Sequence, residues 1–412
     1  MSQVTYPKPL ARAAAGLLFL LLAACSGPGG GAGVTLDLED DYFALYPGEV
    51  RTVSLSVEPT GGFGGSLALE LRQTNGDPAP AWVLLNPSTV NVSGTTTVSL
   101  TLQVAAGAPL GKYPLDLVAG GNRTAFTLHV VPEAGSRWTP RTPPTSQSLY
   151  GVTSGPPHAF LAVGASGAAY YSDDAGATWT DHSTPSGYTL NAAAPVSATT
   201  YIAAGYNRST WRIDVAASTT TDVTPSYGVG YFHDIALGGG RYVIVGMKGE
   251  IYTSDDDGLT WTARTSGTTK TLEVVVYDGT RFVAAGDDGV LLESADGVGW
   301  TPLPSVAAPN LQGLAYGDGV YVAAATNGEV LVSSDGGASW SSWDSGAAWL
   351  YDVAYGNGTF VVVGANGYVL TSNDQGAHWT LRVVGADSLF GVAYGNGTFV
   401  AVGKNGRVLT SP

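Results

Sequence analysis

The sequence predicts an all-β protein, and three features carry that prediction. Only 12% of the 412 residues are charged, while glycine alone accounts for 57 of them. Such a composition favours many short strands joined by tight turns. Hydrophobic and polar side chains alternate along residues 97–104, which is the period of a strand with one buried face. A unit of about 40 residues then recurs from residue 137 to residue 412.

The first 24 residues have the features of an export signal. Two basic residues precede a short apolar run, 17–22, which is too short for a comfortable membrane span. Residues 22–25 read Leu-Ala-Ala-Cys and resemble the lipobox of bacterial lipoproteins, in which cleavage leaves the cysteine as the acylated N-terminus. The resemblance implies a signal peptide over 1–24 and a lipid on Cys25. The alternatives are an ordinary cleaved signal or a fortuitous cysteine.

Charge and cysteine content limit the expected partners. Cys25 is the only cysteine, so no intramolecular disulfide can form. Without residues 1–24 the chain carries 16 basic and 33 acidic residues, a net charge of −17, which repels nucleic-acid phosphates. We therefore expect no nucleic-acid partner. Ser26 stands where, by resemblance to lipoprotein sorting, an aspartate would favour the inner membrane. We expect an exported protein anchored by its lipid in the outer membrane or at the cell surface.

The first folded domain is expected over residues 34–132, after a Gly-rich tether at 25–33. Short strand-forming runs alternate there with turn signals, which is typical of a β-sandwich. Residues 108–113, Ala-Pro-Leu-Gly-Lys-Tyr, resemble the late-strand motif of bacterial immunoglobulin-like domains. The resemblance implies an immunoglobulin-like sandwich, although the cysteine pair of antibody domains is absent. The expected strands are 50–57, 67–71, 82–85, 95–104, 112–118 and 124–131.

Residues 137–412 contain seven copies of one unit. The copies align on a strand that ends in Val-Val-Val-Gly or a variant of it, and successive copies are 39 to 41 residues apart. This period, with several short strands per copy, predicts a seven-bladed β-propeller in which each copy is a four-stranded blade. The aligned positions are Gly164, Gly205, Gly246, Gly286, Ala325, Gly364 and Gly403.

The sixth copy shows the plan of a blade. We expect its inner strand at 350–355, its second strand at 359–363 and its third at 368–372, with Trp379 opening the fourth. Asn366-Gly367 joins the second and third strands and is the pair that a type I′ turn favours, because both central residues need positive φ. The equivalent pairs are Lys248-Gly249, Asp288-Gly289, Asn327-Gly328 and Asn405-Gly406.

The seventh copy lacks its own fourth strand. It stops at Leu409-Thr410-Ser411-Pro412, after the third strand. Residues 137–139, Arg-Trp-Thr, precede the first copy and resemble a fourth strand such as that beginning Trp379-Thr380. We expect the two ends of the propeller to pair, which closes the ring and removes two exposed strand edges.

A motif recurs between the third and fourth strands. The pattern Ser-x-Asp-x-Gly-x-x-Trp occurs in four copies, and a shortened form spans 294–300. It resembles the Asp-box, or bacterial neuraminidase repeat, of sialidases, xyloglucanases, sortilins and photosystem II assembly factors. The second copy departs from it, since 218–223 read Ser-Thr-Thr-Thr-Asp-Val. The box aspartates are Asp174, Asp256, Asp296, Asp335 and Asp374.

We interpret the boxes as structural. The aspartate should accept backbone N–H bonds, the glycine should allow positive φ, and the tryptophan should pack between blades. A rival reading is calcium binding at 255–257, but the spacing of a calcium loop is missing there, and we expect neither metal nor cofactor. The family resemblance also implies that the boxes lie on the face opposite the usual ligand site.

Aromatic residues gather where the loops between blades and the hairpins between second and third strands share one face, here named the top face. Amide and carboxylate side chains accompany them. Such platforms suit stacking on sugars or capture of a peptide, although half of the rings are expected simply to pack between blades. Tyr227 and Phe232 fall in the same loops. The candidate ligand-face residues are Tyr150, Tyr188, Tyr231, His233, Asp234, Glu273, Gln312, Trp349, Tyr351, Asp352 and Phe390.

The first function that the sequence leaves open is a monomeric, non-catalytic envelope scaffold that binds a glycan or a protein. Residues 137–412 resemble the photosystem II assembly factors in their repeats, which include Gly-Asn-Gly-Thr-Phe-Val turns. Those factors carry a basic patch on the propeller, whereas this domain is acidic, which puts the same partner in doubt. Fold alone does not transfer function.

The second is a glycoside hydrolase of sialidase type. That chemistry needs three arginines, a tyrosine activated by a glutamate, and an aspartate acid/base. Only Arg208 and Arg407 are expected near the top face, and no Arg-Ile-Pro motif opens the first blade. Related sialidases have six blades, and xyloglucanases have two tandem propellers. A different carboxylate pair, Asp234 with Glu273 or Asp352, would be required, and we assign no catalytic residue.

Overall fold

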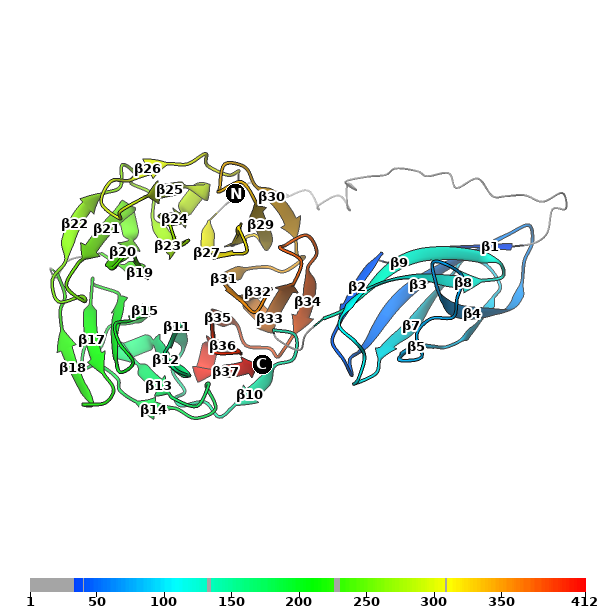
Figure 1. Ribbon diagram of the computed structural model, residues 1–412, viewed down its shortest axis with the longest axis horizontal. Coiled ribbons are helices and arrows are strands. Elements are labelled where there is room, and N and C mark those ends of the chain that lie inside the picture. The colour runs from blue at the N-terminus through cyan, green and yellow to red at the C-terminus, as the bar shows by residue number, and fades with distance from the viewer. Residues whose placement is uncertain (1–32, 40, 132–134, 226–229, 308–309) are drawn as a thin grey trace, which may run out of the picture.

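The computed structural model describes residues 33–39, 41–131, 135–225, 230–307 and 310–412. Cys25 and Tyr227 lie outside these residues. The described chain forms two bodies joined end to end, a sandwich of two sheets and a ring of sheets (Figure 1). No helix of the described residues is long and apolar enough to cross a membrane.

The N-terminal body is a β-sandwich around a single hydrophobic core. One sheet has the order β1-β3-β7-β5 and the other the order β2-β9-β8-β4-β6, in which β2 runs parallel to β9. All six expected strands are present, whereas β1, β2 and β6 were not predicted from the sequence. The strands are β1 (Gly33–Leu38), β2 (Tyr42–Leu45), β3 (Val50–Thr60), β4 (Gly65–Gln73), β5 (Val83–Asn86), β6 (Thr89–Val92), β7 (Thr96–Val104), β8 (Gly111–Ala119) and β9 (Asn122–Val130).

Strands β10 to β37 form seven four-stranded sheets that stand around a common axis, the arrangement of a β-propeller (Figure 1). The first strand of each sheet lies nearest the centre of the ring. The first four sheets comprise β11 (Leu149–Gly155), β12 (Ala159–Gly164), β13 (Ala169–Ser172) and β14 (Thr180–Asp181); β15 (Leu190–Pro195), β16 (Thr200–Gly205), β17 (Thr210–Asp214) and β18 (Thr219–Asp222); β19 (Phe232–Gly238), β20 (Arg241–Gly246), β21 (Glu250–Ser254) and β22 (Thr262–Thr265); β23 (Leu272–Tyr277), β24 (Phe282–Gly286), β25 (Leu291–Ser294) and β26 (Thr301–Pro302).

The remaining three sheets complete the ring. All seven propeller sheets are numbered 1 to 7 in the chain order of their first strands, so these three are sheets 5 to 7. Their strands are β27 (Leu311–Gly317), β28 (Val320–Ala325), β29 (Glu329–Ser333) and β30 (Ser341–Asp344); β31 (Leu350–Gly356), β32 (Thr359–Gly364), β33 (Tyr368–Ser372) and β34 (Thr380–Val383); β35 (Leu389–Gly395), β36 (Thr398–Gly403), β37 (Val408–Ser411) and β10 (Thr139–Arg141).

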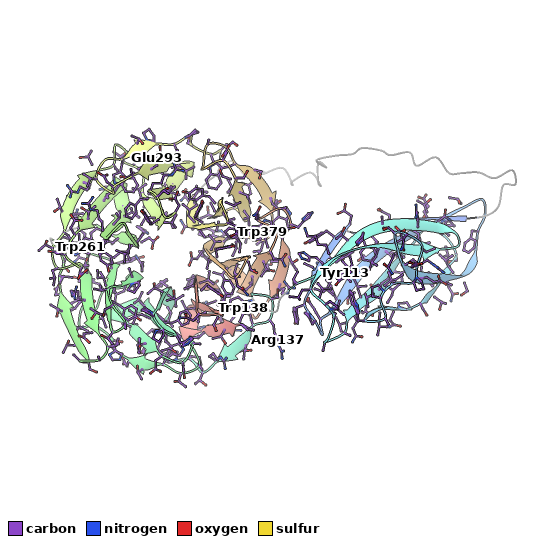
Figure 2. The ribbon with its side chains drawn as sticks, viewed as in Figure 1. Tyr113, Arg137, Trp138, Trp261, Glu293 and Trp379 are labelled. Carbon is purple, nitrogen blue, oxygen red and sulfur yellow. The ribbon has the colours of Figure 1, made fainter. Side chains whose placement is uncertain are left out.

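The two ends of the propeller segment pair in sheet 7. Strand β10 runs antiparallel to β37, with Thr139 opposite Thr410 and Arg141 opposite Val408. Arg141 Nε also donates to Thr410 Oγ1 at 2.8 Å. The predicted closure is therefore confirmed, with the strand beginning at Thr139, immediately after Trp138 (Figure 2).

Hydrophobic cores lie between neighbouring sheets. Each second strand is covered on both faces, and every residue of β12, β28 and β32 is buried. Burial on both faces explains why these strands are continuous hydrophobic runs and do not alternate. One core joins Val322 of sheet 5 to Phe360 and Leu370 of sheet 6. Each sheet is therefore fixed by its neighbours.

The hairpins between second and third strands place backbone turns on the top face. Asn366 and Gly367 have φ values of 56° and 67°, as a type I′ turn requires, and the pairs at 248–249, 288–289 and 405–406 behave in the same way. The type I′ prediction is wrong at Asn327-Gly328, where only the glycine has positive φ. There the Asn327 Oδ1 accepts the N–H of Glu329 at 3.1 Å, which stabilises a different turn.

The sandwich rests against the outer end of sheet 6. The ring of Tyr42 stacks on that of His378, with centroids 4.0 Å apart and planes 11° from parallel. Lys112 Nζ lies 3.4 Å from Asp374 Oδ2, and Arg382 donates to Glu49 Oε2 at 3.1 Å. Figure 1 accordingly shows the sandwich beside β34, away from the central axis. The top face is left free of the sandwich at the centre of the ring.

Candidate functional site

The first strand of every propeller sheet carries the same β-bulge. In each sheet the pairing with the second strand shifts directly after the opening Leu or Phe. A bulge inserts one unpaired residue and redirects its side chain, and bulges are common next to functional sites. The seven bulged residues are Tyr150, Asn191, His233, Glu273, Gln312, Tyr351 and Phe390.

All seven bulged side chains line one cavity of about 130 Å³, here named the axial pocket. It opens on the top face, because the bulges lie at the beginning of the inner strands, where the chain enters each sheet. The remaining lining residues lie one or two positions further along the same strands and are Gly151, Val152, Ala192, Ala193, Asp234, Val274 and Asp352. A repeated backbone feature thus brings one side chain from each sheet to a single place.

The axial pocket has an aromatic arc, contributed by the contiguous sheets 6, 7 and 1. Tyr150 and Phe390 stack with centroids 5.2 Å apart and planes at 26°. Tyr351 meets Phe390 edge to face, also at 5.2 Å. The rings therefore form one continuous wall that offers both faces and edges to a ligand.

The opposite, polar arc comes from sheets 2 to 5. His233 Nδ1 lies 2.8 Å from Glu273 Oε2. In a neutral imidazole with the hydrogen on Nδ1, Nε2 is a hydrogen-bond acceptor. The His233 Nε2 is buried without a hydrogen-bond partner among the described residues. Asn191 donates its Nδ2 to the carbonyl of Phe232 at 2.7 Å, so its Oδ1 remains as an acceptor.

Two half-buried aspartates lie below the ring of bulged residues. Asp234 Oδ2 accepts the N–H of Val275 at 2.9 Å, and Asp352 Oδ2 accepts that of Val392 at 2.8 Å. Each carboxyl group thereby fastens its sheet to the next one. Burial raises the pKa of Asp234 to about 6 and that of Asp352 to about 7, although the backbone donors oppose the shift.

Glycine takes the place of these aspartates in three other sheets. The inner strands approach so closely that a Cβ on Gly313 would lie 2.6 Å from the Cα of Asp352. A side chain at that position would displace the neighbouring backbone. The position below the bulge therefore serves packing between sheets, and the bulged position above it serves the pocket.

A rim of exposed aromatic side chains surrounds the pocket. Five of the six large aromatic side chains that are exposed in the described chain lie on the top face, and only Tyr316 lies at the other end of its sheet. Tyr206 and Tyr231 stack with centroids 4.4 Å apart. Burial raises the pKa of Tyr206, and Tyr150, Tyr231 and Glu273 add to the shift, which places it near the pocket. The five rim residues are Tyr150, Tyr188, Tyr206, Tyr231 and Trp349.

The structure brings most of the candidate ligand-face residues together. Tyr188, Tyr231 and Trp349 lie on the rim. Phe232 is among the rings that pack between sheets, since it is buried between sheets 2 and 3. Asn191 and Tyr206 were missed; Asn191 follows the opening Leu190 as the other bulged residues follow theirs, so aligning the copies there would have found it. The pocket-lining candidates are Tyr150, His233, Asp234, Glu273, Gln312, Tyr351, Asp352 and Phe390.

Neither arginine expected near the top face lines the axial pocket. Arg208 is paired with Glu250. Arg407 donates to the carbonyl of Val384 at 2.7 Å. The described residues around the pocket therefore lack the arginine clamp that sialidase chemistry uses.

The Asp-boxes lie at the other end of the sheets and have the predicted structural role. Asp256 Oδ1 accepts the N–H of Thr260 at 2.9 Å, and its Oδ2 accepts the Thr260 hydroxyl at 2.6 Å. That hydroxyl holds the pKa of Asp256 at about 2. Gly258 has a φ of 76°, and Trp261 packs between sheets 2 and 3, far from the axis (Figure 2).

The other boxes repeat this geometry. The aspartates at 174, 335 and 374 also accept the N–H four residues later, and the shortened box of Asp296 accepts the N–H groups of Val298 and Gly299. Of the triplet 255–257, Asp255 is paired with Arg241, with 2.6 Å between Oδ1 and Nε. No group of three or more His, Cys, Asp or Glu in the described chain is arranged to hold a metal ion.

Comparison with known proteins supports this class of fold. Residues 266–393 match the model of the DUF6242 beta propeller domain, and residues 170–181 match the BNR/Asp-box repeat. The chain is thus a β-propeller with an Asp-box repeat. No curated protein matches it in sequence.

Solved structures add likeness in fold alone. YCF48 bound to D1 peptide is 17% identical with a TM-score of 0.57, and the match covers 66% of this chain and 96% of that one. YCF48 from Cyanidioschyzon merolae is also 17% identical, with a TM-score of 0.54 and coverages of 66% and 98%. The WD40 propeller domain of Doa1 is 13% identical, with a TM-score of 0.55 and coverages of 66% and 95%.

Proposed function

We propose that this chain is a non-catalytic binding module that holds a protein partner on its top face, centred on the axial pocket. The carrying observation is the convergence of seven bulged side chains, one from each sheet, on that pocket. The aromatic rim around it is the second support, because contiguous exposed aromatic surface marks sites of interaction.

The proposal treats each of the seven four-stranded sheets as one blade of a seven-bladed propeller. It treats the N-terminal body as an immunoglobulin-like domain. In support, β1-β3-β7 and β9-β8-β4 follow the A-B-E and G-F-C orders of that fold, while the edge strands β5 and β6 occur in the opposite chain order to its D and C′ strands. The sandwich then acts as a spacer, fixed to sheet 6 by Tyr42 and Arg382.

A peptide segment suits the top face better than a glycan. The pocket, at about 130 Å³, has room for one side chain, whereas sites for small molecules usually enclose roughly 300–1,000 Å³. The rim rings would then contact residues on either side of the inserted one. The structurally similar YCF48 is itself described as bound to a peptide, although at 17% identity that protein lends only an analogy.

A glycoside hydrolase finds less support. Such enzymes need two carboxyl groups that reach the glycosidic bond, one of them free to protonate it. Asp234 and Asp352 are half-buried and accept backbone N–H bonds on both oxygens, and Glu273 is paired with His233. We therefore propose no catalytic pair.

The proposal includes export and lipid anchoring through Cys25, which lies outside the described residues. Its support is the signal-like segment 1–24 and the lipobox-like residues that end in this cysteine. Metabolic labelling with radioactive palmitate in a bacterial host tests it. Label on the wild type that is lost in Cys25→Ser is expected, and an unlabelled wild type would exclude the anchor.

The binding proposal is tested with the full chain in detergent on arrays of envelope-protein peptides and of glycans. We expect peptide binding that Tyr231→Ala and Trp349→Ala weaken at least tenfold. Tyr316→Ala is the matched control, because that tyrosine is similarly exposed (36% against 40% for Tyr231) but lies on the opposite face. Binding to glycans alone, hydrolysis of fluorogenic glycosides, or equal loss in the control would overturn the proposal.

A further inference from the structure

We propose that the axial pocket accepts the positively charged side chain of an arginine from the bound partner. The inference rests on the proposed function and adds a chemical class to it. It combines three observations on the pocket, which are its charge, its unsatisfied acceptors and its aromatic wall.

The lining is acidic, and among the described residues only His233, which is paired with Glu273, is a basic group in it. Three of its residues are acids, Asp234, Glu273 and Asp352, and none of the described lysines or arginines lines the pocket. Arg208 is paired with Glu250, and Lys270 is paired with Asp288. With a net charge of −15 over the whole chain, the field of the protein adds to the attraction of a cation.

The polar arc offers acceptors that have no partner among the described residues. His233 Nδ1 faces Glu273, and the buried Nε2 of the same ring has no hydrogen-bond partner among the described residues. The Asn191 Oδ1 is available because the amide nitrogen is bound to the carbonyl of Phe232. A guanidinium group has five N–H donors and no acceptor, which is the complement of this arc.

The aromatic arc completes the site. Tyr150, Tyr351 and Phe390 form one wall opposite the polar arc. A planar guanidinium stacks on such rings, and the cation–π attraction grows when the site excludes water. An ammonium group would satisfy the charge but not the planar stacking, so we expect lysine to bind more weakly than arginine.

The test uses the full chain and five-residue peptides with blocked ends. The probes are acetyl-Gly-Gly-Arg-Gly-Gly-amide and the same peptide with lysine, glutamate or citrulline at the centre. Citrulline is nearly isosteric with arginine but uncharged. Titration by NMR should show the arginine peptide binding at least tenfold tighter than the citrulline peptide, and more weakly at 300 mM than at 50 mM salt.

Variants locate the effect. Glu273→Gln should reduce affinity for the arginine peptide about tenfold and should abolish the preference over citrulline. Glu329→Gln, at a half-buried glutamate that accepts from Asn327 Nδ2 and does not line the axial pocket, is the control and should change neither. Thermal unfolding of each variant verifies that the fold is kept.

Two results would overturn the inference, namely equal affinity for arginine and citrulline, or an unchanged preference in Glu273→Gln. These results leave the proposed function standing if the arrays still reveal a partner whose binding Tyr231→Ala weakens. If no peptide or glycan on the arrays binds, the proposed function itself is overturned.

Discussion

The two ends of the propeller sheets both repeat from sheet to sheet, but different features repeat at each end. At the Asp-boxes the side chains repeat, and so do their hydrogen bonds: Asp174, Asp256 and Asp335 each accept the same two bonds from the Thr or Ser four residues later. At the axial bulges only the backbone repeats. Seven copies of the bulge carry six residue types.

The difference separates structure from function within a single chain. A side chain that recurs in copy after copy meets a need that every copy has, which here is a stable turn. A side chain that differs between copies on the same backbone is not required for the stability of every copy. The bulged side chains nevertheless converge on one pocket. Because the seven backbone positions are equivalent, only different side chains at them can form a pocket with distinct polar and aromatic sides.

Sheet 6 shows a box with an added task. His378 stands where the other full boxes have Thr or Ser, and its ring bonds Asp374 Oδ2 at 2.8 Å while stacking on Tyr42 of the sandwich. The turn keeps its hydrogen bond from the backbone to Asp374. A single departure from the repeat therefore marks the contact between the two bodies, as the bulged residues mark the pocket.

Two tryptophans give the strongest test of the comparison. Trp379 of the box in sheet 6 is 9% exposed and packs in a core with Leu370, whereas Trp349 of the rim is 53% exposed. We expect Trp379→Ala to lower the free energy of unfolding by about 3–5 kcal/mol. Trp349→Ala should stay within about 0.5 kcal/mol of wild type but should weaken partner binding.

Urea unfolding followed by circular dichroism, with the peptide array, measures both effects. A large loss of stability in Trp349→Ala would place this side chain in the core and remove it from the rim. A small loss in Trp379→Ala would contradict the structural reading of the box.

Most of the fold could be predicted from the sequence because repetition exposes it. The alignment at Gly164 and its six equivalents located the sheets, and the likeness of residues 137–139 to other fourth strands located the closure. Strands β2 and β6 were missed, since four residues give too little alternation to recognise. The turn at Asn327 was mispredicted because its side chain stabilises another conformation.

The candidate site was predictable only in part. Position at the start of an inner strand indicated the face but not which ring is buried, so Phe232 and Tyr231 could not be told apart although one is in the core and the other on the rim. Tyr231 precedes the strand and pairs with Tyr206 of sheet 2, whereas Phe232 is the first residue of β19 and packs between sheets 2 and 3. Nor could sequence show that Asp234 and Asp352 bridge neighbouring sheets, because each contact crosses to a different copy.

The aspartates at the two ends should respond to pH in opposite directions. Asp352 has its pKa raised to about 7, above the unfolded value of 3.8, so its stabilising contribution is complete below pH 3.8 and is lost as the pH rises through 7. Asp352→Asn cannot ionise and avoids this loss. The melting temperature of Asp352→Asn minus that of the wild type should therefore be about 5 °C higher at pH 8 than at pH 4.

Differential scanning calorimetry across that range checks the effect. Asp234→Asn is the companion variant, and its gain should appear at lower pH because its pKa is about 6. Parallel pH profiles for wild type and Asp352→Asn would contradict the burial of an ionisable group at this position.

The box aspartates predict the reverse, on a smaller scale. Asp256 has a pKa of about 2, below its unfolded value of 3.8, so its contribution is present above pH 3.8 and is lost as the pH falls through 2. Asp256→Asn should lower stability at pH 7 by about 1 kcal/mol or less, since the group is exposed and screened by solvent. The deficit should shrink toward pH 2.

Urea unfolding at pH 7 and pH 3 measures the deficit. Asp257→Asn, one residue away and also exposed, is the control and should not change stability at either pH. If both variants lose stability equally, the hydrogen bonds of Asp256 are not what stabilises the turn.

The smallest expected effect on stability tests the bulged position most directly. Gln312 lines the axial pocket on a backbone that is the same in all seven sheets, so Gln312→Glu should leave the free energy of unfolding within about 0.5 kcal/mol of wild type. The added carboxylate should nevertheless tighten binding of acetyl-Gly-Gly-Arg-Gly-Gly-amide about threefold. Gln103→Glu adds the same charge at an exposed position of β7 in the sandwich and should leave affinity unchanged. Because the bulge already carries six residue types, Glu among them, a gain confined to Gln312→Glu would mean that the bulged side chains set the specificity of the pocket. Equal affinities would mean that the pocket does not recognise charge.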